Sequence, residues 1–138
     1  FIDMLKEFEI STQKNQELVD ITNKVKEIVE KSEIEEGTCI VYVPHATAGI
    51  IINENHDPLV CKDIINQLDE IIPESKSYEH DKIDNNAHSH IKASIIGPSE
   101  SIIIQNNELK LGTWQGIALA EFDGPRSLRK VYIKVIEG

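Results

Sequence analysis

The last part of the chain consists almost entirely of β-forming segments, and this limits the fold more than any other feature. The final segment, 129–136, alternates apolar and polar residues, so Val131, Ile133 and Val135 share one face of a strand. Two earlier segments are expected to pair across Asn106-Asn107, a hairpin-type turn. The strands expected in this part are 101–105, 109–113, 116–122 and 129–136.

The earlier part of the chain alternates between strand and helix patterns, which favours a mixed fold. We expect strands over 4–12, 38–43 and 46–53, and helices over about 20–32 and from 58 to Pro73. Asp20 is a plausible cap of the first helix, and Asp57-Pro58 is a strong start for the second. Their apolar stripes are Ile21, Val25, Ile28 and Val29 in the first helix, and Val60, Ile64, Leu68 and Ile71 in the second.

Composition and charge bound the class of protein. The 138 residues suit one domain, 1–138, with a single core. A formal net charge of −10 opposes binding to nucleic-acid phosphates. No apolar run approaches the roughly 20 residues of a membrane span, and the first ten residues resemble no secretory signal. We therefore expect a cytoplasmic protein with neither nucleic-acid nor membrane partners. Its two cysteines form no CxxC motif.

The stretch from His80 to Gly97 concentrates polar chemistry and has two structural interpretations. As a helix it would be capped by Asp84 and end at Gly97-Pro98, with one apolar face. That inward face would consist of Ile83, Ala87, Ile91 and Ile95. As a strand, it would place His88, His90 and Lys92 together on one face. The apolar spacing and the Gly-Pro stop favour the helix.

Four histidines lie in polar surroundings and could serve a metal or a proton transfer. They are His45, His80, His88 and His90. Imidazoles with an orienting carboxylate are typical of metal sites, but the spacing matches no HExxH motif. In a helix, His88 and His90 point about 200° apart, whereas Asp84, His88 and Lys92 share a face. Without a metal, His88 with Asp84, or His45 with Glu54, would form an acid–base pair.

Other side chains suit the binding of an anionic group. The candidates are Thr47, Lys92, Thr113, Gln115 and Arg126. A helix beginning near Asn85 would add backbone donors. Arg126 follows a Gly-Pro turn and suits bidentate capture of phosphate or carboxylate. The alternative for Arg126 is a structural ion pair with Asp123 or Glu121. The single tryptophan, Trp114, is expected in the core or at an interface.

Three blocks of the sequence together resemble the YjbQ family. They are HATAGIIINEN at 45–55, DNNAHSHIKASIIGPS at 84–99 and LGTWQGIALAEFDGPR at 111–126. The resemblance implies an α+β fold in which an antiparallel β-sandwich carries two or three packed helices, in a homotrimer. It also implies a polar pocket near a subunit boundary, around His45, Asn53, Glu54, His80, His88 and His90. Ala46 and Leu128 depart mildly from the family pattern.

The resemblance implies an activity like that of thiamine-phosphate synthase. Such a transferase joins a pyrimidine diphosphate to a thiazole phosphate and releases pyrophosphate. His45, Asn53, Glu54 and His88 are the expected catalytic residues, and His80, His88 and His90 are the expected ligands of a divalent metal, zinc or magnesium. Two alternatives stay open: a metal-assisted hydrolase or lyase of a small phosphorylated metabolite, and a non-enzymatic trimeric module that binds a metabolite or metal.

Overall fold

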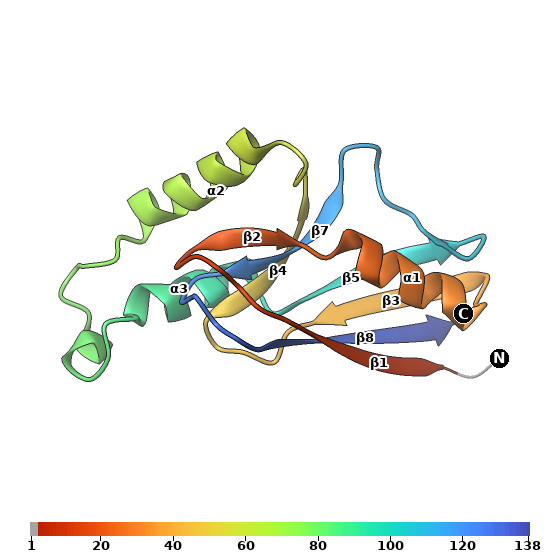
Figure 1. Cartoon of the computed structure of the whole chain (residues 1–138), viewed down its shortest axis with the longest axis horizontal. Helices are drawn as coiled ribbons and strands as arrows, with labels where there is room; N and C mark the ends of the chain where they lie inside the picture. The colour runs from red at the N-terminus through yellow and green to blue at the C-terminus, as the bar shows by residue number, and fades with distance from the viewer. Residues whose placement is uncertain (1–2) are drawn as a thin grey trace.

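The computed structural model describes residues 3–138, which form an α+β domain of two antiparallel sheets and three α-helices (Figure 1). The five-stranded sheet has the order β1 (Met4–Ile10), β8 (Arg129–Glu137), β3 (Glu36–Tyr42), β5 (Ser99–Gln105) and β6 (Glu108–Leu109). The three-stranded sheet has the order β2 (Glu17–Asp20), β7 (Gly116–Glu121) and β4 (Ala48–Asn53). The expected α+β class and antiparallel pairing are confirmed.

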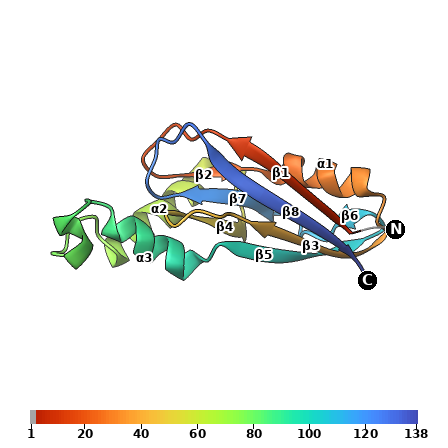
Figure 2. The same ribbon diagram turned by 90° about the horizontal axis from the view of Figure 1, so that it is seen from below.

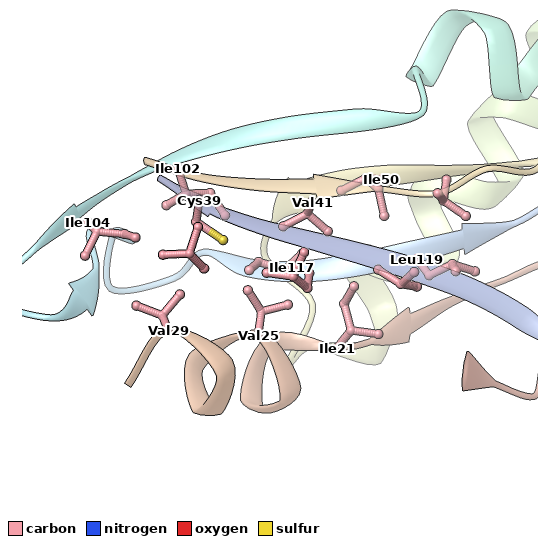
Figure 3. Close-up of a cluster of buried hydrophobic side chains, with 14 of the residues drawn as sticks. Ile21, Val25, Val29, Cys39, Val41, Ile50, Ile102, Ile104, Ile117 and Leu119 are labelled. Atoms are coloured by element: carbon pink, nitrogen blue, oxygen red, sulfur yellow. The ribbon is translucent and has the colours of Figure 1, made fainter. Parts of the chain in front are cut away.

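The main core lies between the two sheets and beneath α1 (Thr22–Ser32) (Figure 3). The alternation in β8 places Val131, Ile133 and Val135 in this core, as predicted. From α1, Val25 and Val29 point into the same cluster. The period of 2 in the strands and of 3.6 in the helix therefore bury one continuous set of branched apolar side chains.

Helix α1 begins at Thr22 with Ile21 as its N-cap, so the predicted cap Asp20 lies one residue before the N-cap. Asp20 Oδ1 accepts a hydrogen bond of 2.9 Å from the backbone N–H of Thr22. This bond satisfies one of the backbone donors that a helix leaves unpaired at its start. The apolar stripe predicted for this helix is also the one that the structure buries, with Ile28 only partly covered.

The second helix, α2 (Pro58–Ile71), starts as predicted, and its inward face agrees with the predicted stripe only in part. Asp57 Oδ1 accepts 2.9 Å from the backbone N–H of Leu59 and so caps it. The side chains that pack on the three-stranded sheet are Ile65 and Leu68. Ile71, expected on the inward face, is exposed. Because α2 is apolar over more than one stripe, the periodicity was correct for Leu68 but missed Ile65 and wrongly included Ile71.

The third helix, α3 (Ala87–Ile96), confirms the helical interpretation of the central stretch but reverses its expected facing. Ile83, which precedes the helix, is 86% exposed and Ile95 is 64% exposed, and only Ala87 of the predicted stripe is buried. His88, Ser89 and Lys92 are buried in their place. The predicted cap was also wrong: Asn86 is the N-cap, and Asp81 Oδ1 rather than Asp84 accepts from the backbone N–H of Ala87 at 3.2 Å.

Several shorter features were missed or misjudged. β2 has no counterpart among the expected strands, and a 3-10 helix that was not expected spans Glu79–Lys82. The hairpin at Asn106-Asn107 forms with both residues at positive φ, 55° and 60°, but β6 has only two residues. Within residues 3–138, no helix has the length and apolar character needed to cross a membrane.

Candidate functional site

A buried lysine on α3 organises the polar cluster. The side chain of Lys92 is fully buried, and its ammonium forms an ion pair with Asp69 of α2. It also donates to Oε1 of Gln16 and to Nδ1 of His88, each at 2.9 Å. Gln16 Nε2 in turn donates to both carboxylate oxygens of Asp69, at 2.9 and 3.1 Å. An ammonium has three N–H donors, and here each one has an acceptor.

The other edge of the His88 ring faces acceptors. His88 is 3% exposed, and its Nε2 lies 3.4 Å from Ser89 Oγ and 3.8 Å from Glu74 Oε1. Ser89 Oγ donates to the carbonyl of Phe122 at 2.5 Å, so toward His88 it acts as an acceptor. Burial and the positive charge of Lys92 lower the pKa of His88 from its ordinary value. Because Nδ1 accepts from the Lys92 ammonium, the ring is neutral in this arrangement. The contacts of His88 do not include Asp84, so the acid–base pair expected there does not form.

Next to α3, the carboxylate of Asp123 links Asn86 and Arg126. Asp123 Oδ2 accepts from Asn86 Nδ2 at 2.9 Å and from Arg126 Nη2 at 2.8 Å. The structural ion pair considered for Arg126 is thus the one that forms, with Asp123 rather than Glu121. The guanidinium nevertheless stays about half exposed, and the Oδ1 atom of Asn86 is buried without a partner. The exposed part of the Arg126 guanidinium is therefore the donor that a bound molecule could reach here.

A fully buried ion pair between Glu121 and Arg129 lies next to Asp123. Both carboxylate oxygens of Glu121 accept from Arg129, and Oε1 also accepts from Thr12 Oγ1 at 2.7 Å. Burial alone would raise the pKa of Glu121, but the hydrogen bonds from Arg129 and Thr12 outweigh it and lower the pKa. Thr47 is buried, and its hydroxyl accepts from Arg129 Nη2 at 2.9 Å. Thr47 therefore serves this network in the structure.

His45 lies at the same end of the molecule. Its Nε2 accepts from the backbone N–H of Lys130 at 2.9 Å, so a neutral ring carries its proton on Nδ1. Burial lowers the pKa of His45, and the nearby charges of Arg129 and Arg126 act in the same direction. Its half-buried ring and the exposed part of Arg126 belong to one region of the surface.

The remaining two histidines form a pair of their own. The rings of His80 and His90 meet edge to face, with centroids 5.1 Å apart. They line a shallow hollow of about 370 Å³ together with Tyr78 and Ile91. His88 faces the other side of α3, as the 100° turn per residue predicts. Across residues 3–138, no three His, Cys, Asp or Glu side chains converge as a metal site would require.

The other predicted residues lie at the far end of β4 and β7. Asn53 ends β4 opposite Gly116, whereas the chain near His45 precedes the start of that strand. Glu54 follows directly, and Gln115 Oε1 accepts from the backbone N–H of Gly112 at 2.8 Å. Thr113 is exposed, and Trp114 is 70% exposed, so Trp114 is not a core residue. Within one chain, Glu54 therefore does not pair with His45.

Known proteins resemble this chain over most of its length. The family model described as "UPF0047 protein YjbQ-like" matches residues 6–138. The chain belongs to the YjbQ family. A UPF0047 protein of Methanocaldococcus jannaschii is 48% identical over 135 residues, which cover 98% of this chain and 96% of the relative. YugU of Bacillus subtilis is 44% identical over 136 residues, which cover 96% of this chain and 99% of the relative.

Solved structures of YjbQ relatives have the same fold. A YjbQ/UPF0047 protein of Clostridium acetobutylicum is 50% identical, with a TM-score of 0.90 over 95% of this chain and 99% of that one. A protein of unknown function from Sulfolobus solfataricus is 39% identical, with a TM-score of 0.96 and 99% coverage of both chains. The two polar ends described above are thus part of a YjbQ fold.

Sequence reasoning found His88 and Lys92 on one face of this YjbQ helix but missed most of their partners. Gln16, Asp69 and Glu74 come from other segments, and none stands in a recognisable motif. Arg129 was also missed, although the sequence carries a signal for it. It lies two residues before Val131 in an alternating strand, so its side chain lies on the same inward face. A charged residue on an inward face indicates a buried ion pair.

Proposed function

We propose that this protein is a thiamine-phosphate-synthase-like transferase that acts on small phosphorylated metabolites at the face formed by His45, His88 and Arg126. The observation that carries the proposal is the buried, neutral His88, whose Nε2 edge faces acceptors. The charge of Asp123 acts on His88, and Asp123 pairs with Arg126, which is about half exposed. A preorganised neutral donor beside a guanidinium suits a phosphate or diphosphate.

In the proposed reaction, the bond between the pyrimidine methylene carbon and its diphosphate oxygen breaks. A bond from that carbon to the thiazole nitrogen forms, and pyrophosphate leaves with the electron pair. Negative charge accumulates on the leaving oxygen, so donors placed there lower the barrier. Arg126 and the Nε2 edge of His88 would supply them. His45, with its proton on Nδ1, would orient a substrate.

We further propose that the protein is a homotrimer and that each site is shared between two copies. Asn53, Glu54, Thr113 and Gln115 of one copy would lie against the face of another copy formed by His45, His88 and Arg126, which we call the histidine face. Two observations support this: these residues lie at the opposite end of β4 from His45, and Ile83, Ile95 and Trp114 are exposed. Mixing inactive His88→Ala and Glu54→Ala subunits tests it. Recovery of activity on reassembly is expected if the site is shared. Independent sites within each chain would give none.

A divalent metal is proposed only at the His80–His90 pair, because their rings lie together. Two imidazoles do not complete a zinc site, so other ligands would come from the substrate or a neighbouring copy. The metal would neutralise diphosphate charge or, in a hydrolase, activate water. Elemental analysis of untagged protein tests it. Bound metal that is lost in His90→Ala but kept in His88→Ala is expected.

The activity itself is tested by incubating the purified protein with both substrates and measuring thiamine phosphate. Product formation that falls strongly in His88→Ala and Arg126→Ala is expected. His56→Ala, at an exposed histidine outside the cluster, is the matched control. Equal rates of product formation in the wild type and all three variants, or no product from any of them, would refute the proposed activity.

A further inference from the structure

The contacts around Lys92 define what His88 can offer to a ligand. An ammonium only donates hydrogen bonds, so the His88 Nδ1 atom that lies 2.9 Å from Lys92 Nζ must be an acceptor. A neutral imidazole has one donor and one acceptor nitrogen. The proton of neutral His88 is then on Nε2. The surroundings of Nε2 agree, since Glu74 and Ser89 both present acceptors to it.

The position of the Lys92 ammonium is set by two residues outside α3. Asp69 lies on α2 and Gln16 just before β2, separated from Lys92 by 23 and 76 positions along the chain. Gln16 contacts both partners, because its Oε1 accepts from Lys92 and its Nε2 donates to Asp69. Lys92, Gln16 and Asp69 are therefore each bonded to the other two. A long side chain with several rotatable bonds is thereby restricted to one direction, toward His88.

We infer that Gln16 and Asp69 are positioning residues, which hold Lys92 against Nδ1 of His88 and so lock His88 as an Nε2–H donor for an anionic ligand. This inference deepens the proposed function and names the ligand chemistry of the same site, a diphosphate or another multiply charged anion. None of the three supporting groups touches the ligand. Their effect reaches it through the single N–H of His88.

The lock also bears on metal binding by His88. A metal ion needs a nitrogen lone pair, and the lone pair on Nδ1 already accepts from Lys92. On Nε2 the proton occupies the place that a metal would take. The histidine face therefore favours an anion at His88, whereas any metal falls to the His80–His90 pair on the other side of α3.

Nuclear magnetic resonance at about pH 8 tests the inference on the intact protein, with the neutral ring predominant. The nitrogen shifts of His88 report which atom carries the proton, and a persistent Lys92 ammonium signal reports slow proton exchange. The wild-type protein is expected to show only the Nε2–H form together with a protected ammonium. A wild-type ring protonated on Nδ1 would overturn the inference.

Three variants assign the role of each residue. In Asp69→Asn and Gln16→Leu, ammonium exchange is expected to rise roughly tenfold, the effect of losing one charge-assisted hydrogen bond, and the Nδ1–H form should appear. Asp63→Asn, an exposed carboxylate on the same helix, is the matched control and should match the wild type. An unchanged spectrum in either test variant removes that residue from the positioning role.

Inorganic pyrophosphate probes the ligand class. Its addition is expected to shift the Nε2–H resonance of His88 in the wild type, and more weakly in Asp69→Asn. A resonance unmoved by saturating pyrophosphate would overturn the donor role. None of these spectra requires turnover. If His88 is protonated on Nε2 but no thiamine phosphate forms, only the proposed reaction is refuted. If thiamine phosphate forms although His88 is not protonated on Nε2, only the positioning of His88 by Lys92 is refuted.

Discussion

Helices α1 and α3 are of similar length, yet they bury opposite kinds of side chain. In α1, Val25 and Val29 enter the main core, and the exposed face carries an ion pair between Glu27 and Lys31. In α3, the buried face carries His88, Ser89 and Lys92 beside two alanines, and Ile91 and Ile95 are exposed. A helix can thus be held by an apolar stripe or by a satisfied polar network. The second arrangement places titratable groups inside the fold.

The largest expected effect is a charge placed in the apolar stripe of α1. Val25→Asp puts a carboxylate without a partner into the main core, at a cost of about 5 kcal/mol, enough to unfold a domain of this size. Circular dichroism of the purified variant checks this. Asn23→Asp, at an exposed position of the same helix, is the control. A folded Val25→Asp protein would mean that α1 is not held as described.

Removal of the buried charge of α3 should cost less. Lys92→Met keeps the volume but leaves Gln16 Oε1 and His88 Nδ1 without a donor, while Asp69 can turn to water. A loss of about 2–4 kcal/mol is expected from two unsatisfied buried acceptors. Urea unfolding measures it, with Lys62→Met on the exposed part of α2 as control. Equal stability of the two variants would show that the network contributes little.

The comparison also predicts a difference in pH sensitivity. Because the folded-state pKa of His88 is lowered, the unfolded chain binds the proton more readily, and stability falls as pH drops below about 6.5. Amide exchange should therefore accelerate in α3 before α1. His88→Gln should flatten the dependence, and an unchanged slope in that variant would contradict the role of His88.

The smallest effect on the fold is expected on the outer face of α3. Ile95→Asp replaces an exposed side chain, so the unfolding free energy of the isolated chain should change by no more than about 0.5 kcal/mol. Association between chains, if this face forms a contact, should weaken strongly. Urea unfolding and sedimentation measure the two effects separately. An unfolded variant would mean that this face supports the chain itself.

These contrasts explain which features could be predicted from sequence. Periodicity identified all three α-helices and most strands, because spacing along the chain is a local property. It failed on the facing of α3, since an apolar stripe was assumed to be buried, and on β2, which is only four residues long. The site was found in part: His88 and Lys92 share a face by helix geometry. Gln16 is 76 positions from Lys92, and no local pattern reports such a contact.

The termini have a practical consequence for protein engineering. β1 and β8 are neighbours, Met4 pairs with Val135, and the backbone N–H of Glu137 donates to Asp3 Oδ1 at 3.1 Å. In Figures 1 and 2 the start of β1 and the end of β8 lie at the side of the molecule away from α3. A short peptide linker could join them, so new termini could be opened in an exposed loop by circular permutation. A reporter domain fused at these ends would also leave the histidine face accessible.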